Sequence, residues 1–208
     1  MAPLTLVMAT KNPGKVREMA ELLRDLGVRL LSLADFPELP DIPEEGTTFR
    51  ENAVAKAREV ARLTGLPALA DDSGLEVAAL DGRPGVWSAR YALDVTGGRP
   101  PTDEENWRKL LAEMAPVPWE RRQARFVCVM ALAWPDGRLY TTEGELRGLI
   151  ALAPRGDQGF GYDPVFWLPE YQKTVAELPL AEKNRISHRG EAGRRLKAWL
   201  GQVGLAEN

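Results

Sequence analysis

The pattern of apolar residues changes period near the start of the chain, and each change predicts an element. Residues 4–9 form a short apolar run, which is typical of a buried strand. Apolar residues then recur at helical spacing between positions 16 and 26, and Gly27 is a suitable C-terminal cap. This part of the chain therefore predicts a strand, a polar loop over residues 10–14 and a helix.

Two later helices are predicted by the same N-terminal signal. Thr48 and Glu51 have the spacing of a capping box, and the apolar residues that follow them keep helical spacing. Thr102 and Glu105 repeat this pattern before a second segment with helical spacing. Residues 191–200 also have the pattern of a helix.

Strand signals lie between and after these helices. Residues 67–70 form a short apolar strand that is expected to end in a turn at Asp71. The runs 123–134 and 138–146 flank a turn sequence at residues 135–137, so they predict a hairpin. Strands that alternate with helices, together with a hairpin, predict an α/β fold with a mixed sheet.

Composition places the chain in the ordinary globular class. Of its 208 residues, 44% are apolar and 27% are charged, and the formal net charge is −3. A chain of this length can form one large domain or two closely joined lobes. Because the net charge is slightly negative, no general field attracts polyanions, and long nucleic acids are not expected as partners.

Cysteine usage and hydropathy indicate the compartment. Cys128 is the only cysteine and lies in an apolar run, so a core position is expected, and a disulfide within the chain is excluded. The single His188 cannot complete a zinc cluster with it. No run reaches the ~18 apolar residues of a membrane span, and the first residues lack a basic targeting region. These features predict a soluble, cytoplasmic protein with no membrane partner.

The first loop is a candidate phosphate site. The candidate ligands are Thr10, Lys11, Asn12, Pro13, Gly14 and Lys15. Amides at a helix start and the positive end of the helix dipole attract phosphate oxygens. Lys15 opposes that dipole, and a bound anion would explain a lysine in the first turn. The alternative is a solvated surface lysine, because the segment is not a P-loop.

Acidic residues in two segments are candidates for a magnesium site. Asp71 and Asp72 directly follow the predicted strand 67–70, and ligands collect at such strand ends in α/β sheets. Their side chains point to opposite faces on extended chain, so one is expected to face the site while the other holds the turn. Asp72 with Glu44 or Glu45 would supply the oxygen ligands that Mg²⁺ prefers. The alternative is an Asx-type turn beside a solvated acidic loop.

Two later segments are candidates for binding a base and a sugar. A turn places Phe160 and Tyr162 among glycines; glycine lets the backbone approach a ligand, and an aromatic face can stack on a base. Further along, His188 and Arg189 can donate hydrogen bonds to a purine carbonyl or a phosphate. Core packing of the aromatics and capping of a helix that begins near residue 187 are the corresponding structural alternatives.

Six segments together resemble the inosine triphosphate pyrophosphatase family, also called the Ham1 family, through nearly the whole chain. They are Thr10-Lys11-Asn12 with Lys15; Glu44-Glu45-Gly46 with Phe49, Glu51 and Asn52; Ala70-Asp71-Asp72-Ser73-Gly74-Leu75; Pro84-Gly85 with Ser88-Ala89-Arg90-Tyr91; Gly159-Phe160-Gly161-Tyr162-Asp163-Pro164; and Lys183 with Ser187-His188-Arg189-Gly190. Each segment is weak alone, but six in the family's order are highly specific.

The resemblance implies a fold, an activity and residue roles. The fold is one domain over residues 1–208, with a long mixed β-sheet spanning two lobes, flanking helices and a nucleotide cleft between the lobes, and the usual assembly is a homodimer. The activity is Mg²⁺-dependent hydrolysis of the non-standard purine triphosphates ITP, dITP and XTP to monophosphate and pyrophosphate, which cleanses the nucleotide pool. Asp72 and Lys15 are implied to be catalytic, and Glu44 and Asp72 to bind the metal. The implied substrate ligands are residues 10–15 together with Ser73, Phe160, Gly161, Tyr162, Asp163, Lys183, His188 and Arg189.

Two positions depart from the family's pattern, and two other functions remain open. The acidic loop commonly reads Glu-Glu-Thr-Gly but here reads Pro43-Glu44-Glu45-Gly46, so Glu44 is favoured as metal ligand and Glu45 is the alternative. Lys11 replaces a common glycine and is either a phosphate contact or a solvated side chain. The other functions are a Maf-type pyrophosphatase for modified pyrimidine triphosphates and a sensor that binds triphosphate without turnover.

Overall fold

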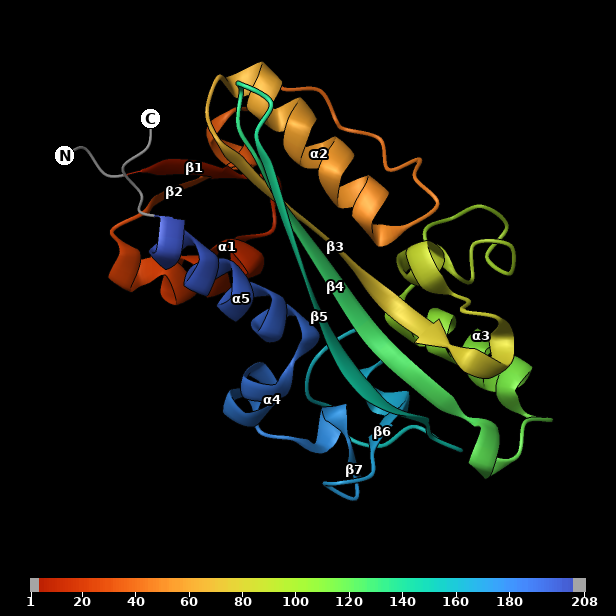
Figure 1. Cartoon of the computed structure of the whole chain (residues 1–208). Helices are drawn as coiled ribbons and strands as arrows, with labels where there is room; N and C mark the ends of the chain where they lie inside the picture. Colours follow the sequence, from red (N-terminus) through yellow and green to blue (C-terminus); the bar gives the residue numbers. More distant parts are fainter. Residues whose placement is uncertain (1–3, 204–208) are drawn as a thin grey trace. The chain divides into compact units, whose positions relative to one another are not determined.

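The structure, a computed structural model, describes residues 4–203 (Figure 1). Within these residues the strands form a seven-stranded sheet in the order β2-β1-β3-β4-β5-β6-β7. The strands are β1 (Thr5–Met8), β2 (Arg29–Ser32), β3 (Ala68–Val77), β4 (Gln123–Ala133), β5 (Leu139–Ile150), β6 (Phe166–Leu168) and β7 (Lys173–Thr174). The α-helices are α1 (Pro13–Leu23), α2 (Phe49–Thr64), α3 (Asp103–Met114), α4 (Leu180–Ile186) and α5 (His188–Val203). β1 pairs in parallel with β2 and β3, whereas β6 is antiparallel to β5 and β7, which confirms the mixed α/β class.

The described chain divides into two compact units. Unit 1 contains residues 4–72, 128–144 and 191–203, and unit 2 contains residues 73–127 and 145–190. Strands β3, β4 and β5 contribute residues to both units. Each unit has a hydrophobic core of its own. The single two-lobed domain with a nucleotide cleft stays a prediction.

Unit 1 packs α1 and α5 against its strands. Met19 of α1 and Leu196 of α5 are buried in one cluster with Leu6 of β1 and Met130 of β4. The helical spacing at both ends of the sequence directs such side chains toward the same core. Figure 1 shows α2 on the other side of β3 from α1 and α5. Cys128 is buried in this core, as its apolar surroundings in the sequence predict.

α1 begins earlier than the sequence predicts. Pro13 and Gly14 belong to its first turn, and Asn12 is the N-cap. Proline is well tolerated at this position because an amide hydrogen there would have no partner within the helix. The predicted loop therefore loses its last two residues to the helix.

Both predicted capping boxes are present. At α2 the Thr48 hydroxyl accepts a hydrogen bond from the amide of Glu51 at 3.1 Å, and the Glu51 carboxylate accepts one from the amide of Thr48 at 3.1 Å. Thr102 and Glu105 repeat this arrangement at α3, with distances of 3.2 and 2.7 Å. The two helices consequently begin where the sequence signal places them.

β3 is longer than predicted. The sequence predicts a turn at Asp71, but the chain stays extended to Val77. Leu75 and Val77 are buried in the core of unit 2, and the amide of Leu75 donates to the Ser88 hydroxyl at 2.8 Å. These contacts give the strand an apolar face and a polar partner beyond the aspartates. The Asx-type turn is therefore wrong, and Asp71 and Asp72 both lie inside a strand.

The predicted hairpin is confirmed, and shorter elements were missed. β4 and β5 flank residues 135–137, where Gly137 has a φ of 95°. β5 continues beyond the prediction to Ile150. Strands β2, β6 and β7 and helix α4 are too short to show a clear period in the sequence. Among the helices within residues 4–203, none is long and apolar enough to cross a membrane.

Unit 2 packs α3 and β6 against its strands. Leu110 of α3 is buried in one cluster with Leu75 of β3, Phe126 of β4 and Phe166 of β6. The rings of Phe126 and Phe166 stack with their centroids 4.3 Å apart. Aromatic rings bury large apolar areas, so this pair is a main contribution to the core of the unit.

A buried arginine joins the end of α3 to the end of β5. Arg122 is 2% exposed, and its guanidinium donates four hydrogen bonds to backbone carbonyls. The acceptors are Ile150 at 2.7 Å, Met114 at 2.7 Å, Val117 at 3.0 Å and Ala151 at 2.9 Å. Burial lowers the pKa of Arg122, but guanidinium groups stay protonated in proteins. One side chain thus satisfies four carbonyls from two stretches of unit 2, residues 114–117 and 150–151.

Candidate active site

β3 presents its two neighbouring carboxylates to two different helices. Asp71 Oδ2 lies 2.8 Å from the Nζ of Lys15 in α1. Asp72 Oδ2 accepts a hydrogen bond at 2.9 Å from the Nδ2 of Asn52 in α2. Because neighbouring strand residues point to opposite faces, each aspartate meets a different layer of unit 1. The predicted separation of the two carboxylates is therefore confirmed.

The ion pair between Lys15 and Asp71 is largely shielded from water. The Asp71 side chain is 4% exposed and that of Lys15 is 28% exposed. A carboxylate at this depth needs a close cationic or hydrogen-bonding partner, because leaving it without one is costly. The lysine that opposes the dipole of α1 therefore has a carboxylate partner within the protein, Asp71.

The start of α1 is capped by its own sequence. Asn12 Oδ1 accepts a hydrogen bond from the amide of Gly14 at 2.8 Å, and Thr10 Oγ1 accepts one from the amide of Asn12 at 3.1 Å. Lys11 is exposed, and its Nζ lies 3.2 Å from Asp41. A phosphate bound at this polar turn would share its amides with the cap or displace it.

A chain of hydrogen bonds links Asp72 to the acidic loop. The side chain of Asn52 donates to Asp72 through Nδ2, and its Oδ1 accepts from the amide of Gly46 at 2.7 Å. Asn52 is only 3% exposed. The loop that carries Glu44 and Glu45 is thus joined, through one side chain, to the carboxylate on β3.

The carboxylates of this region suit a hard cation that is held partly by substrate. Glu44 pairs with Lys56 of α2, and Glu45 is exposed. Among residues 4–203, no group of three or more His, Cys, Asp or Glu side chains is arranged to hold a metal ion. Mg²⁺ usually takes one or two protein carboxylates and completes its shell with phosphate oxygens and water. Asp72 and Glu44 match that donor set.

The aromatic turn of unit 2 divides its two rings between surface and core. Phe160 is 61% exposed, and Lys183 Nζ lies 4.3 Å from the centroid of its ring. Tyr162 is buried, and its hydroxyl donates to the carbonyl of Ser88 at 2.7 Å. Burial raises the pKa of Tyr162. The ring of Phe160 is therefore exposed, whereas that of Tyr162 supports the turn from within.

A buried ion pair closes the base of this turn. Asp163 Oδ2 lies 2.5 Å from the Nζ of Lys183 in α4 and accepts the amide of Phe160 at 2.9 Å. Burial raises the pKa of Asp163, and the nearby ammonium opposes this shift. Gly159 has a φ of 89°, and a Cβ there would lie 2.1 Å from Asp163 Oδ2. The turn therefore needs glycine at this position.

The remaining predicted site residues are half-buried. His188 and Arg189 are the first two residues of α5, and Ser73 lies on β3. The ring of His188 stacks on Phe126, with centroids 5.0 Å apart and planes at 16°. Phe126 thus covers one face of the imidazole, and this stacking fixes the orientation of the ring.

Comparison with known proteins identifies the family. The description "Ham1 family" belongs to the family profile that matches residues 6–199. The chain belongs to the Ham1 family. The resemblance seen in its six motifs is therefore confirmed.

Relatives of this Ham1 protein carry the name dITP/XTP pyrophosphatase. The one from Geobacter sulfurreducens is 54% identical over 200 residues, which cover 96% of this chain and 98% of that protein. One from Thermus thermophilus is 57% identical over 194 residues, which cover 93% of this chain and 90% of that protein. The solved structure of a HAM1 protein from Coxiella burnetii is 47% identical, has a TM-score of 0.89 and covers 96% of this chain and 99% of that one.

The structure of this Ham1 protein adds two residues of α2 to the predicted site. Asn52 contacts Asp72, and Lys56 contacts Glu44. They stand one helical turn apart, beside the buried apolar residues of the helix. A polar residue among the buried apolar residues of a helix face is the signal in the sequence that could have indicated Asn52, because a buried amide needs a defined partner.

A third added residue, Asp103, holds the aromatic turn. It is the first residue of α3, and its Oδ2 accepts a hydrogen bond from the amide of Gly161 at 2.7 Å. The two positions are 58 residues apart in the sequence. No local pattern indicates a contact across that separation.

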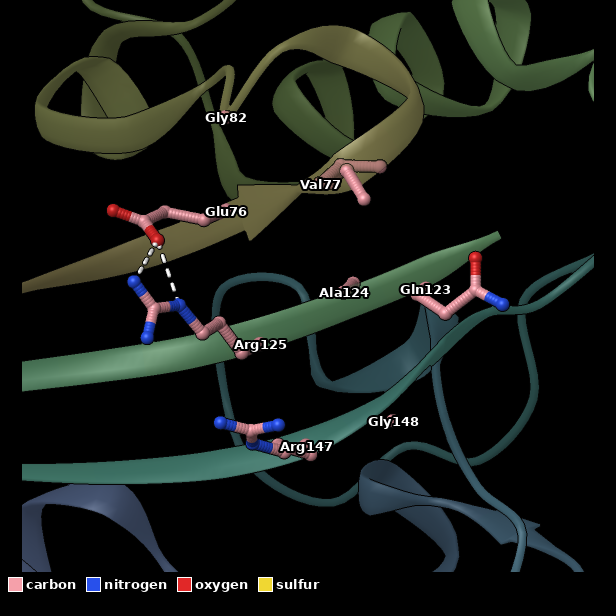
Figure 2. A pocket seen from close by; sticks show the side chains of 9 residues that line it. Glu76, Val77, Gly82, Gln123, Ala124, Arg125, Arg147 and Gly148 are labelled. Carbon is pink, nitrogen blue, oxygen red and sulfur yellow. Dashed lines mark hydrogen bonds and ion pairs between the residues drawn. The ribbon is translucent and has the colours of Figure 1, made fainter. Parts of the chain in front are cut away.

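Unit 2 also contains a hollow of about 460 Å³ (Figure 2). It is lined by residues of β3, β4 and β5, including Glu76, Arg125 and Arg147, and by none of the predicted site residues. Arg125 pairs with Glu76 at 2.7 Å, and Arg147 pairs with Glu145 at 2.6 Å. Because none of the predicted phosphate ligands lines it, we do not assign phosphate binding of this Ham1 protein to the hollow.

Proposed function

We propose that this protein hydrolyses dITP, XTP and ITP to the nucleoside monophosphate and pyrophosphate, and so removes them from the nucleotide pool. The observation that carries the proposal is the placement of two carboxylates on β3: Asp71 holds the ammonium of Lys15, and Asp72 is held by Asn52. A cation and a carboxylate fixed by one strand suit a reaction that binds a triphosphate and directs water at it. The relatives named dITP/XTP pyrophosphatase support the substrate class.

In this mechanism the chain binds the phosphates and orients water. Lys15 and the polar turn before it hold the phosphate oxygens. Asp72 accepts a hydrogen bond from the attacking water and directs its oxygen at the α-phosphorus. The new P–O bond forms, the bond from the α-phosphorus to the bridging oxygen breaks, pyrophosphate leaves with that oxygen, and one proton of the attacking water is released to solvent. Mg²⁺, held by Asp72 and Glu44, would supply charge neutralisation on the phosphate oxygens.

Residues of unit 2, including the first two of α5, recognise the base. The exposed ring of Phe160 offers a stacking face, and Lys183 adds a cation beside it. His188 and Arg189 donate hydrogen bonds to the 6-oxo group of hypoxanthine or xanthine. The 6-amino group of adenine is itself a donor, so it opposes the same contacts.

We also propose that the protein works as a homodimer, as the family resemblance implies, and that it does so in the cytoplasm. The buried Cys128 suits a reducing compartment. Light scattering after size-exclusion chromatography tests the assembly. A mass of twice 23.0 kDa is expected, and a monomer at micromolar concentration contradicts it.

Product analysis tests the proposed activity. The purified protein is incubated with dITP, XTP and ITP in Mg²⁺, in EDTA, and in EDTA followed by excess Mg²⁺. Pyrophosphate and the monophosphate are expected in the first and third conditions. Release of orthophosphate with a nucleoside diphosphate, or full turnover in EDTA, contradicts the proposal. A modified pyrimidine triphosphate, run in parallel, tests the Maf-type alternative.

Replacing Arg189 by Ala is expected to reduce discrimination between dITP and dATP as well as rate. A site built around a hydrogen bond to one substrate can separate close analogues by up to ~10⁴-fold, because the analogue leaves polar groups without partners. The ratio of kcat/KM for dITP to that for dATP measures the effect. This ratio should fall toward one in Arg189→Ala.

Arg194→Ala is the matched control for this prediction. Arg194 lies on the same helix but is exposed, so its loss should leave the ratio unchanged. If Arg189→Ala slows dITP and dATP by the same factor, Arg189 binds phosphate and does not read the base.

A further inference from the structure

We infer that Asn52 is a positioning residue, which holds the acidic loop and the carboxylate of Asp72 in one fixed arrangement. The inference rests on the proposed function, because it assigns Asp72 to the reaction. It starts from a side chain that is 3% exposed and uses both ends of its amide, accepting from Gly46 at 2.7 Å and donating to Asp72 at 2.9 Å.

The chemistry of the two partners fixes the orientation of this amide. The backbone N–H of Gly46 can only donate, so the atom of Asn52 that faces it must be the oxygen. An ionised carboxylate can only accept, so the atom that faces Asp72 must be the nitrogen. A flipped amide would place its nitrogen, a donor, against the N–H of Gly46 and its oxygen, an acceptor, against the carboxylate of Asp72. Asn52 therefore holds the loop and the carboxylate in a single orientation of its amide.

The first turn of α2 holds the end of the acidic loop by three consecutive amides. The amide of Gly46 donates to Asn52, and the amides of Thr47 and Thr48 donate to Glu51 at 2.8 and 3.1 Å. Hydrogen bonds from Thr47 and Thr48 lower the pKa of Glu51, so this acceptor stays ionised near neutral pH. The loop carrying the two glutamates therefore leaves α2 from a fixed point.

Gly46 shows how close the loop comes to Asn52. A Cβ at position 46 would lie 2.6 Å from Asn52 Oδ1 and 2.8 Å from the Cβ of Glu51. Real Cβ atoms do not approach other atoms so closely, so the hydrogen bond and a side chain at this position exclude each other. The loop and Asn52 are thus matched in shape as well as in hydrogen bonding.

The chain contains an internal comparison for Asn52. Asn106 follows Thr102 and Glu105 as Asn52 follows Thr48 and Glu51, and both asparagines are 3% exposed. The amide of Asn106 binds two backbone groups: it accepts from the amide of Ala92 at 2.9 Å and donates to the carbonyl of Ala89 at 3.3 Å. Helix position, burial and hydrogen bonding are therefore alike. What distinguishes Asn52 is that its donor end meets a carboxylate.

This comparison supplies a matched pair of variants, Asn52→Ala and Asn106→Ala. Both are expected to lower the melting temperature, because each leaves buried polar groups without a partner. Only Asn52→Ala is expected to lower kcat of the folded protein, by about 10- to 100-fold, the usual effect of removing a group that orients a reactive or metal-binding one. Asn106→Ala should stay within about twofold of the parent. The measurement is pyrophosphate release at saturating dITP and Mg²⁺, with a melting curve for each variant.

Two further variants keep the test decisive if Asn52→Ala folds poorly. Asn52→Asp keeps the size and the acceptor for Gly46, but it places a carboxylate against Asp72. Gly46→Ala keeps Asn52 and displaces the loop. Both should lower kcat by at least about 10-fold when dITP and Mg²⁺ are saturating. Normal kcat in all three folded variants overturns the inference.

A structural readout separates this inference from the proposed function. Hydrogen exchange of the Gly46 amide, followed by NMR, should accelerate in Asn52→Ala and stay unchanged in Asn106→Ala. Unchanged exchange in both variants overturns the inference whatever the substrate is. A parent protein that releases no pyrophosphate contradicts the proposed function, whereas an active parent with a fully active Asn52→Ala contradicts the positioning role alone.

Discussion

Replacing Asp72 by Asn is expected to lower kcat for dITP by ~10² or more, while the protein stays folded. Asn keeps the size of the side chain but removes the charge that orients water and binds the cation, and losses of this order follow when one such contribution is removed. The amide of Asn52, which donates to Asp72 at 2.9 Å, would retain an oxygen to bind. Binding of dITP should therefore suffer less than turnover. The measurement is kcat at saturating Mg²⁺ and dITP, with a melting curve.

Asp71→Asn is the comparison that gives this result its meaning. Asp71 is 4% exposed in its side chain and pairs with Lys15 at 2.8 Å, so its neutralisation should lower stability and weaken phosphate binding through the lysine. Saturated turnover should fall less than in Asp72→Asn. If Asp72→Asn keeps a near-normal kcat while Asp71→Asn is folded and inactive, the two aspartates have been assigned the wrong way round.

Replacing Arg122 by Met is expected to lower the free energy of unfolding by about 3–5 kcal/mol, because each buried carbonyl that loses its donor costs about 1–3 kcal/mol. Methionine fills much of the same space, but it leaves the four carbonyls that Arg122 contacts without those donors. For a chain of this size the melting temperature should drop by roughly 2–4 °C for each kcal/mol. Urea unfolding with a fixed two-state slope measures the change.

The adjacent arginine provides the control for this stability prediction. Arg121 is exposed, so Arg121→Met should change the free energy of unfolding by no more than about 0.5 kcal/mol. Arg122→Lys should not restore stability, because a single ammonium cannot reproduce the planar fork that reaches four carbonyls. An Arg122→Met variant as stable as Arg121→Met would show that water replaces the guanidinium at little cost.

The elements that the sequence predicts well have short-range causes. The capping boxes at Thr48 and Thr102 each involve residues three positions apart, and the structure contains both. The hairpin turn at residues 135–137 is equally local. These elements can be predicted because the local sequence preference and the final fold agree at these positions, so distant contacts do not change the result.

The parts that the sequence does not predict depend on distant partners. Asp71 meets Lys15 across 56 positions, and this contact, with the buried residues that follow, keeps β3 extended where a local rule predicts a turn. The two rings at Phe160 and Tyr162 look alike in sequence but differ in exposure, because the carbonyl of Ser88, 74 positions from Tyr162, receives its hydroxyl. Motif resemblance identified the family, but it did not separate these roles.

Because Asp71 and Asp72 are adjacent on β3, an odd change in the length of the strand and an even one have different effects on where the two carboxylates point. β1 sets the strand's register, with Val7 opposite Ala68 and Met8 opposite Leu69. A deletion or insertion of one residue between that pairing and the aspartates would turn each carboxylate toward the opposite helix, whereas a change of two would keep the facing and shift both by roughly 7 Å. The direction in which both carboxylates point thus depends on whether the change in length is odd or even. Length variation in related chains should therefore occur in the connecting loops and not in this stretch.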